Sequence, residues 1–185
     1  AILRVLFKRV LLMQKNAGGG STITQQLAKQ LYSPPSESFF SRAMKKPVEW
    51  VIALKLERYY TKDEIIKMYL NQFDFLYNAV GIKTAAHVYF GKQPDNLSVE
   101  EAATLIGMLK NPSYFNPVRR PEVCLNRRNV VFEQMRKADY ISEEECEELK
   151  KKPLVIKFHR VDHNDGVAPY FREELRRVMT AEKPD

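Results

Sequence analysis

The chain of 185 residues carries 30 Lys and Arg against 23 Asp and Glu, which gives a net charge of +7. This length accommodates one domain with a real core and the beginning of a second. The two cysteines, Cys124 and Cys146, are too few for a disulfide framework or a cysteine-based metal site, and no apolar run is long enough to span a bilayer.

The positive charge is concentrated near the start of the chain. Residues 1–60 hold 10 Lys and Arg against 3 Asp and Glu, whereas residues 61–185 hold 20 of each. Such a concentration suits a phosphate-rich ligand, an anionic membrane surface or nucleic acid. We rank nucleic acid lowest, because the chain has no nucleic-acid-binding motif and its tyrosines are not interleaved with a basic run.

The first predicted element is a helix over residues 1–14. Its polar residues are mainly Arg4, Lys8 and Arg9, and most of the others are apolar. A helix this apolar is either buried on most sides or lies in a membrane interface with its cations at the headgroups. We expect burial in the core.

The stretch from Gly18 to Gln30 is the centre of the chain's organisation. Three glycines lead into a helix whose start is predicted at Thr22, because Thr22 and Gln25 have the spacing of a capping box. Backbone N–H groups at such a start, with Lys29 two turns further on, form a natural site for phosphate or pyrophosphate. A solvated helix with an ordinary cap accounts for the same pattern.

Two faces of this helix follow from its periodicity. The predicted apolar stripe consists of Ile23, Leu27 and Leu31. The predicted polar face consists of Thr22, Gln26 and Lys29. The polar face has hydroxyl, amide and amine groups but no carboxylate.

A second helix is predicted from Ser41 to Tyr60, and we expect Pro47 to start or kink it. One face carries Arg42, Lys45, Lys46 and Glu49. Three cations close to one carboxylate would lower the pKa of Glu49, although a surface cluster of ion pairs would have the same spacing.

Further capping boxes predict helices that begin near Thr61, Ser98 and Ser142, with Glu64, Glu101 and Glu145 as their partners. An aromatic loop over residues 72–80 precedes a short helix over residues 81–90, and Pro121 is placed as a first helical residue. Residues 154–158 are a candidate strand, and a last helix is predicted to end at Met179.

The segment from Gly19 to Lys29 resembles the second signature of the peptidoglycan glycosyltransferases, glycosyltransferase family 51, which occur in class A penicillin-binding proteins and monofunctional transglycosylases. Gln30 replaces the usual Asn. The third signature is matched by Lys45, Lys46, Glu49, Ala53, Leu56 and Glu57, with Lys45 in place of Arg. The fourth is matched by Lys62, Ile65, Ile66, Tyr69, Leu70 and Asn71. The fifth is matched by Arg127, Val131 and Met135, with Phe132 in place of Leu.

This resemblance implies a mainly α, lysozyme-like glycosyltransferase domain with a short β or linker segment at the C-terminus. We expect residues 1–152 to form that domain, truncated at its N-terminus, and residues 153–185 to begin a linker toward an absent transpeptidase domain. No Ser-x-x-Lys nucleophile motif is present.

The reaction implied is polymerisation of lipid II into β-1,4-linked glycan strands, with inversion and release of undecaprenyl pyrophosphate. The resemblance places Lys29, Lys45, Lys46 and Arg127 at the pyrophosphates. It places Ser21, Thr22, Gln25 and Gln26 at the sugars and phosphates. Glu49 matches the family's second essential glutamate. No cofactor is required, and no metal ligand is assigned; a Mg²⁺ or Mn²⁺ ion at the pyrophosphate is compatible with the family.

The family's general base belongs to a Glu-Asp signature that these residues lack, so we expect this piece to be inactive although its parent polymerises glycan. The expected partners are lipid II, the growing glycan, moenomycin-type inhibitors and the membrane surface, and not nucleic acid. The expected location is the extracytoplasmic face of the bacterial cytoplasmic membrane, with an anchor outside this chain. The alternatives are a non-catalytic lipid II or glycan-binding module, a basic helical nucleic-acid-binding domain and a lytic enzyme, which would require two facing carboxylates.

Overall fold

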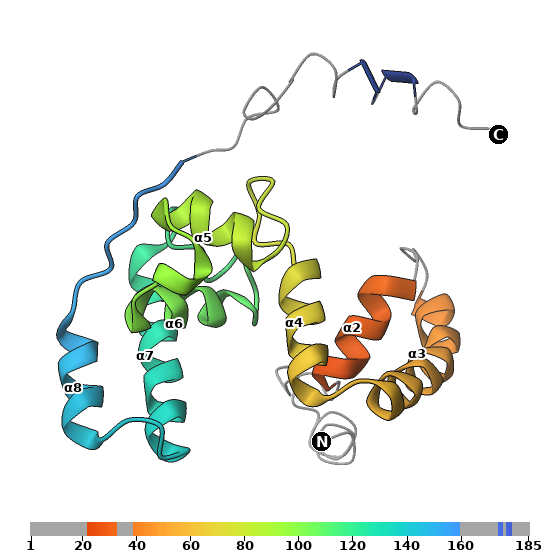
Figure 1. Cartoon of the computed structure of the whole chain (residues 1–185), viewed down its shortest axis with the longest axis horizontal. Helices are drawn as coiled ribbons and strands as arrows, with labels where there is room; N and C mark the ends of the chain where they lie inside the picture. Colours follow the sequence, from red (N-terminus) through yellow and green to blue (C-terminus); the bar gives the residue numbers. More distant parts are fainter. Residues whose placement is uncertain (1–21, 33–38, 160–173, 176, 179–185) are drawn as a thin grey trace. The chain divides into compact units, whose positions relative to one another are not determined.

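The computed structural model describes residues 22–32, 39–159, 174–175 and 177–178 (Figure 1), and it leaves the side chains of residues 39–45 undescribed. The elements in chain order are α2 (Ile23–Tyr32), α3 (Phe39–Tyr59), α4 (Lys62–Gln72), α5 (Ile82–Phe90), η2 (Pro94–Asn96), α6 (Val99–Met108), α7 (Pro121–Lys137) and α8 (Glu143–Lys151). The helix predicted over residues 1–14 lies outside the described residues.

The described residues are predominantly helical and form no sheet, apart from one isolated bridge between Asp74 and Val80. The predicted mainly α class is therefore confirmed. The chain divides into two compact units, the first ending at Gln72 and the second beginning at Phe73. None of the described helices combines the length and the apolar character needed to cross a membrane.

In the first unit, α2 packs against both α3 and α4. The predicted capping box is present: Thr22 N–H donates to Gln25 Oε1 (3.2 Å), and Gln25 N–H donates to Thr22 Oγ1 (3.3 Å). The apolar side of the unit includes Leu27, Ala28, Ala53, Leu56, Ile65 and Tyr69, all buried.

The predicted apolar stripe of α2 is wrong in two of its three members. Ile23 is 46% exposed and Leu31 is 38% exposed. The buried face is instead Thr24, Leu27 and Ala28, which lie at i, i+3 and i+4. Both α3 and α4 pack on α2, so the buried face of α2 is the one that these two helices cover, and it includes the polar Thr24 and the small Ala28.

Pro47 lies inside α3, which begins at Phe39. Pro47 therefore does not start the helix. A proline inside a helix removes one backbone donor and crowds the preceding turn, so tertiary contacts must offset its cost of about 3 kcal/mol. The buried residues Glu49, Ala53 and Leu56 fall at i, i+4 and i+7 on the face of α3 that packs in this unit.

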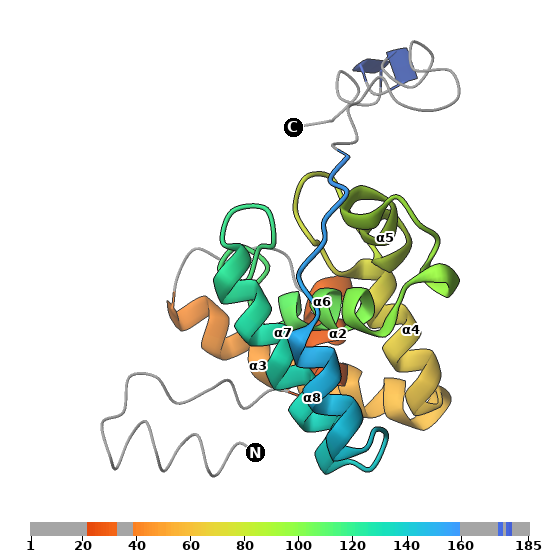
Figure 2. The same ribbon diagram turned by 90° about the vertical axis from the view of Figure 1, so that its left-hand side faces the viewer.

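The second unit is built around α6 and α7, with α8 packed on α7 (Figure 2). Ala103, Phe132 and Cys146 form a buried cluster that Val131, Met135, Ile141 and Leu149 surround. The capping boxes predicted at Ser98 and Ser142 are both confirmed, and Pro121 is the first residue of α7. In the first unit, Thr61 caps α4 through Glu64 as predicted.

The aromatic loop before α5 contains a strained turn. Leu76, Tyr77 and Asn78 have φ values of 69°, 53° and 62°, which are left-handed conformations that cost roughly 1–2 kcal/mol per residue outside glycine. Asp74 Oδ1 accepts from Leu76 N–H (2.8 Å), and the Tyr89 hydroxyl donates to the Phe75 carbonyl (2.6 Å). These bonds hold the turn in place.

The strand predicted over residues 154–158 is wrong. Residues 153–159, which we call the strap, are extended but have no partner strand among the described residues. The strap's Lys157 and His159 N–H groups donate to the carbonyls of Tyr89 (3.0 Å) and Val88 (2.7 Å). These carbonyls belong to the last turn of α5, where four carbonyls have no acceptor role within the helix. The strap therefore caps α5.

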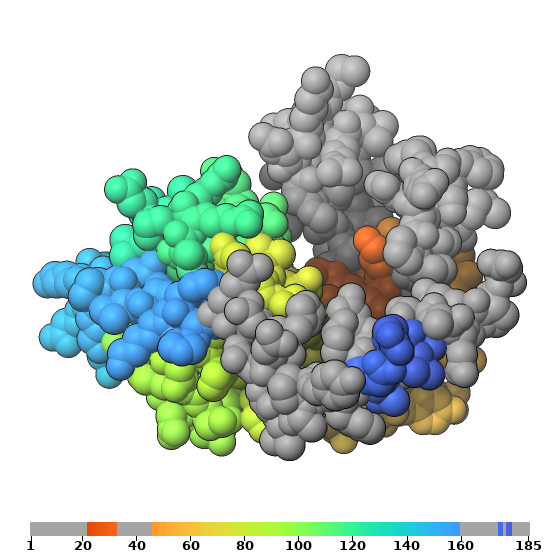
Figure 3. Space-filling model, turned by 90° about the horizontal axis from the view of Figure 1, so that it is seen from above, coloured from red at the N-terminus to blue at the C-terminus, as the bar shows by residue number. Residues whose placement is uncertain are grey.

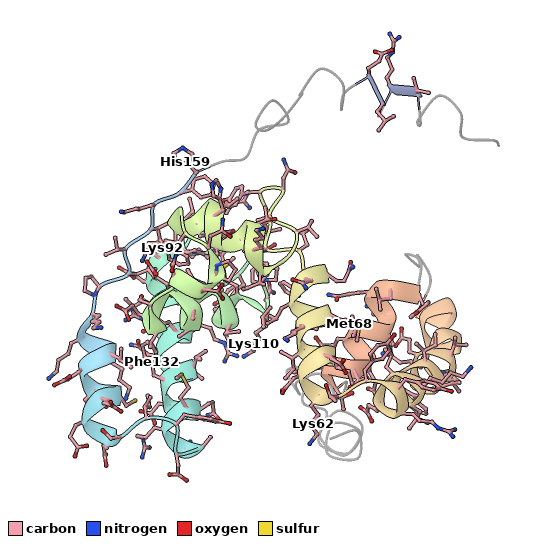
Figure 4. The ribbon with its side chains drawn as sticks, viewed as in Figure 1. Lys62, Met68, Lys92, Lys110, Phe132 and His159 are labelled. Carbon is pink, nitrogen blue, oxygen red and sulfur yellow. The ribbon has the colours of Figure 1, made fainter. Side chains whose placement is uncertain are left out.

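Two ring contacts of Phe158 also fix the strap. The Phe158 ring packs edge-on against Tyr77, with 4.9 Å between centroids, and lies tilted against Tyr89, with 5.9 Å between centroids. His159, labelled in Figure 4, ends the described strap. The atoms of α8 and the strap, both blue, lie on the surface in Figure 3. Most of the last predicted helix lies outside the described residues, although residues 174, 175, 177 and 178 are helical.

Candidate active site

The polar residues predicted on α2 have two different environments. Thr22 and Gln25 satisfy each other in the capping box, so their side chains already hold the helix start. Gln26 accepts at Oε1 a hydrogen bond from the Tyr69 hydroxyl of α4 (3.0 Å). This bond orients the amide so that its NH₂ group can donate outward. Lys29 is exposed one turn further on.

The buried carboxylate of the first unit is Glu49, only 4% exposed, on α3. Lys46 Nζ lies 2.7 Å from Glu49 Oε2, and the Lys46 side chain is 42% exposed. The lysine therefore reaches from solvent to a carboxylate in the interior. A carboxylate in such a place costs desolvation energy, which a charge-assisted bond offsets. The predicted pairing of Lys46 with Glu49 is present.

Two predicted site residues lie outside the description. Ser21 is not described, and neither is the side chain of Lys45. Of the three cations predicted around Glu49, Lys46 is the one whose side chain is described.

Arg127 belongs to the second unit, on α7. Its Nε donates to the Gly107 carbonyl of α6 (3.4 Å), and its guanidinium lies 5.6 Å from the centroid of the Phe115 ring. A Cβ at position 107 would lie 3.2 Å from Arg127 Cγ, so glycine lets the two helices approach. The remaining described candidates belong to the first unit, on α2 and α3 or, for Thr22, directly before α2.

A cavity of about 450 Å³ also lies in the first unit. Its lining is Ile23, Thr24, Glu57, Tyr60, Lys62, Ile65 and Ile66. Neither Lys46 nor Glu49 contributes to it, so this cavity and the carboxylate are separate features.

A family profile described as Transglycosylase matches residues 1–136. The chain belongs to the transglycosylase family. Penicillin-binding protein 1A of Aquifex aeolicus is 45% identical to it over 139 residues, which are 75% of this chain and 19% of that protein. Penicillin-binding protein 1A of Escherichia coli is 37% identical over 161 residues, 87% of this chain and 18% of that protein.

A solved structure of a penicillin-binding protein 1A is also similar to this chain. The crystal structure of penicillin-binding protein 1A from Haemophilus influenzae is similar to 88% of this chain and 20% of that chain, with a TM-score of 0.52 and 28% identity. The predicted fold and family are confirmed. The chain spans about a fifth of the length of these relatives, and it is a transglycosylase domain of the kind found in class A penicillin-binding proteins.

Sequence reasoning assigned no role to two residues of this transglycosylase domain. Tyr69 fell within a matched signature, but nothing in the sequence indicated that its hydroxyl reaches Gln26. Burial raises the pKa of Tyr69, which keeps the hydroxyl a donor. Arg128 is fully buried, and only its neighbour Arg127 was singled out. A sequence does not distinguish a buried arginine from an exposed one.

One group of side chains in the transglycosylase domain has the composition of a metal site. In the described part of the chain, the one group of three donors within 4.8 Å of one another is Glu133, Cys146 and Glu147. Lys150 forms ion pairs with both of these glutamates, so a cation already balances them. Glu49 is not in the group. The described protein donors at Glu49 therefore do not form a metal site by themselves.

Proposed function

We propose that the parent protein of this chain polymerises lipid II into β-1,4-linked glycan and releases undecaprenyl pyrophosphate, and that this domain supplies the part of the site that holds the leaving group. The observation that carries the proposal is the buried Glu49 with its Lys46 partner, on a helix that packs directly against α2. The third and second family signatures are thus adjacent in one unit, as a shared site requires.

The chemistry needs positive charge at a departing pyrophosphate and oriented polar groups at the sugars. Lys29 and Lys46 supply exposed cations in the first unit, and we assign Lys45 and Arg127 to the same task. Tyr69 is a positioning residue, because it fixes the amide that Gln26 offers to a sugar or phosphate oxygen. Ser21, Thr22 and Gln25 complete the polar set, with Thr22 and Gln25 also forming the helix cap.

In the proposed reaction, the 4-hydroxyl of the acceptor sugar attacks the anomeric carbon of the growing glycan. A bond from oxygen to that carbon forms, the bond to the pyrophosphate breaks, and a base accepts the hydroxyl proton. We assign the base to the Glu-Asp signature of the family, which these 185 residues do not contain. Glu49, already bonded to Lys46, is assigned to the leaving-group side and not to proton abstraction.

A Mg²⁺ or Mn²⁺ ion would have one described carboxylate, Glu49, and otherwise phosphate oxygens as ligands. We therefore assign charge neutralisation to the lysines. The proposed partners include moenomycin-type inhibitors, which would compete for the same groups. The proposed location is the extracytoplasmic face of the cytoplasmic membrane, where a lipid-linked substrate of this kind is polymerised.

The test is lipid II polymerisation, measured by gel analysis of the glycan product. It compares the 185-residue chain with a chain that carries the family's Glu-Asp signature before Ala1, and with Glu49→Gln in the longer chain. Asp63→Asn is the matched control, because Asp63 is an exposed carboxylate on the neighbouring helix. We expect polymer only from the longer chain and its control, and a loss of about 100-fold or more for Glu49→Gln.

Polymer from the 185 residues alone would overturn the assignment of the base. Lipid II binding without polymer, even from the longer chain, would instead establish the non-catalytic binding module. Tyr69→Phe in the longer chain distinguishes a positioning role of Tyr69 from a structural one. We expect a raised KM for lipid II with little change in the temperature of unfolding. An unchanged KM would remove Tyr69 from the site.

A further inference from the structure

The segment of residues 111–120 joins α6 to α7 and contains neither helix nor strand. It follows Lys110, which is labelled in Figure 4. Within the segment, Phe115 supports Arg127, whose guanidinium lies 5.6 Å from the centroid of the ring. Arg127 Nε also donates to the Gly107 carbonyl, but at 3.4 Å this bond is long. An arginine side chain has many rotamers, so one held this weakly depends on the ring for its position.

Asn116 holds this segment together from within. The side chain of Asn116 is fully buried. Its Oδ1 accepts from the N–H groups of Val118 (3.0 Å) and Arg119 (3.0 Å), and its backbone carbonyl accepts from the Arg120 N–H (2.8 Å). A segment without helix or sheet has no regular ladder of backbone bonds, so bonds of this kind determine its conformation. Asn116 therefore fixes the segment at the residue next to the supporting ring.

The same side chain connects the segment to α5. Asn116 Nδ2 donates to the Tyr89 hydroxyl (3.4 Å), which donates in turn to the Phe75 carbonyl (2.6 Å). Tyr89 is fully buried, and burial raises the pKa of Tyr89, so its hydroxyl keeps the proton that Phe75 accepts. Breaking such a buried bond is costly, because no water replaces the lost partner. The Asn116 amide thus anchors the segment to the core of the second unit.

We propose that Asn116 is a positioning residue for the transfer reaction, because it holds the Phe115 ring where that ring supports the Arg127 guanidinium. The inference rests on the proposed function, which assigns Arg127 to the departing pyrophosphate. Asn116 itself touches no reacting group and acts through Phe115. Stabilisation by fixed charges requires the charges to be in place before the reaction, and a misplacement of about 1 Å can cost on the order of 100-fold in rate.

A purely structural role of Asn116 would use the same bonds, so the test is a double-mutant cycle. It measures kcat and KM for lipid II in the longer chain, with Asn116→Ala, Arg127→Gln and both. We expect Asn116→Ala alone to lower kcat/KM about 10-fold, mainly through kcat, because charge on the pyrophosphate grows toward the transition state. Added to Arg127→Gln, it should change kcat/KM by less than about twofold, since no guanidinium is left to position.

Thr104→Val is the matched control. Thr104 is fully buried on α6 in the same unit, and its Oγ1 donates to the Glu100 carbonyl (2.7 Å). Among the described residues, no hydrogen bond joins the Thr104 side chain to the segment of residues 111–120. We therefore expect Thr104→Val to lower the temperature of unfolding but to leave kcat/KM unchanged. Tyr89→Phe is the milder second variant, because it keeps the bonds of Asn116 within the segment and removes the tie to α5.

The position of the Arg127 guanidinium is measured independently of activity, by NMR of its Nε–H group in the 185-residue chain. An aromatic ring shifts the resonance of a group that lies against its face. Phe115→Leu should remove this shift, which identifies its source. Asn116→Ala and Tyr89→Phe should both reduce it, whereas the control should keep it.

An Arg127 signal that stays unchanged in both Asn116→Ala and Tyr89→Phe would overturn the proposal. A further loss of about 10-fold when Asn116→Ala is added to Arg127→Gln would also overturn it, because Asn116 would then act independently of Arg127. No polymer from the longer wild-type chain would instead refute the proposed function. The Arg127 signal would still decide whether Asn116 positions that guanidinium.

Discussion

Replacing Arg128 with Met tests how the strap is held. Arg128 is fully buried on α7, and its guanidinium donates to the carbonyls of Lys152 (2.7 Å), Pro153 (3.3 Å) and Lys150 (3.4 Å). These carbonyls are at the end of α8 and the beginning of the strap. Methionine fills much of the same volume but donates no hydrogen bond, so the three carbonyls lose a charged partner.

A hydrogen bond from a charged donor contributes about 1.5–3 kcal/mol, and two of the three bonds here are long. The exposed neighbours Lys151 and Lys152 let water reach part of the site in the variant. We therefore expect the free energy of unfolding to fall by about 3 kcal/mol, which is a fall of about 6–12 °C in Tm for a domain of this size. Burial lowers the pKa of Arg128 while Glu100 raises it, and the guanidinium stays charged at neutral pH.

The assay combines thermal unfolding with hydrogen exchange at the Lys157 and His159 amides, the donors that join the strap to α5. Exchange at both should accelerate in Arg128→Met. Arg136→Met is the control, since Arg136 lies on the same helix and forms a partly exposed ion pair with Glu133, and solvent-exposed pairs contribute little to stability. If Arg128→Met unfolded within a degree or two of the control, with unchanged exchange, the carbonyl contacts would not be what fixes the strap.

Two predictions concern titrating groups. Lys150 and Arg136 lower the pKa of Glu133 to about 2, from an ordinary value of 4.5. Because the folded pKa is the lower one, the stabilisation is complete above the unfolded value and is lost as the pH falls through the folded value. The Tm difference between the wild type and Glu133→Gln should therefore be full at pH 7, small near pH 2 and absent below it. Burial raises the pKa of the Cys124 thiol to about 11, so iodoacetamide at pH 8 should modify it only after unfolding, and modification of the native chain would contradict its burial.

Helix starts were predictable because capping is local. The pairs at Thr22, Thr61, Ser98 and Ser142 each need only a hydroxyl and an acidic or amide side chain three residues later, and all four form as expected. The family signatures likewise needed only sequence, and they led to the correct fold and family.

What the sequence could not specify depends on neighbours far along the chain. The strap has the alternating apolar pattern of a strand, but its hydrogen-bond partners are the free carbonyls of a helix end. The buried face of α2 differs from the predicted apolar stripe because two helices, α3 and α4, pack on α2. Arg128 went unnoticed because its burial depends on the position of α8, and the role of Tyr69 depends on a contact with Gln26, 43 residues away.

The contacts of the strap also determine which helix first resists a force that pulls on the chain after residue 159. If the strap were attached only at the end of α8, it could rotate about residue 152. Here it is also attached at its other end, because the His159 N–H donates to the Val88 carbonyl and the Phe158 ring packs against Tyr77. A pull on the chain beyond residue 159 is therefore borne first by α5 and the strained turn before it. Tension would reach Tyr89, whose hydroxyl holds the Phe75 carbonyl, before it reached α7 or α8.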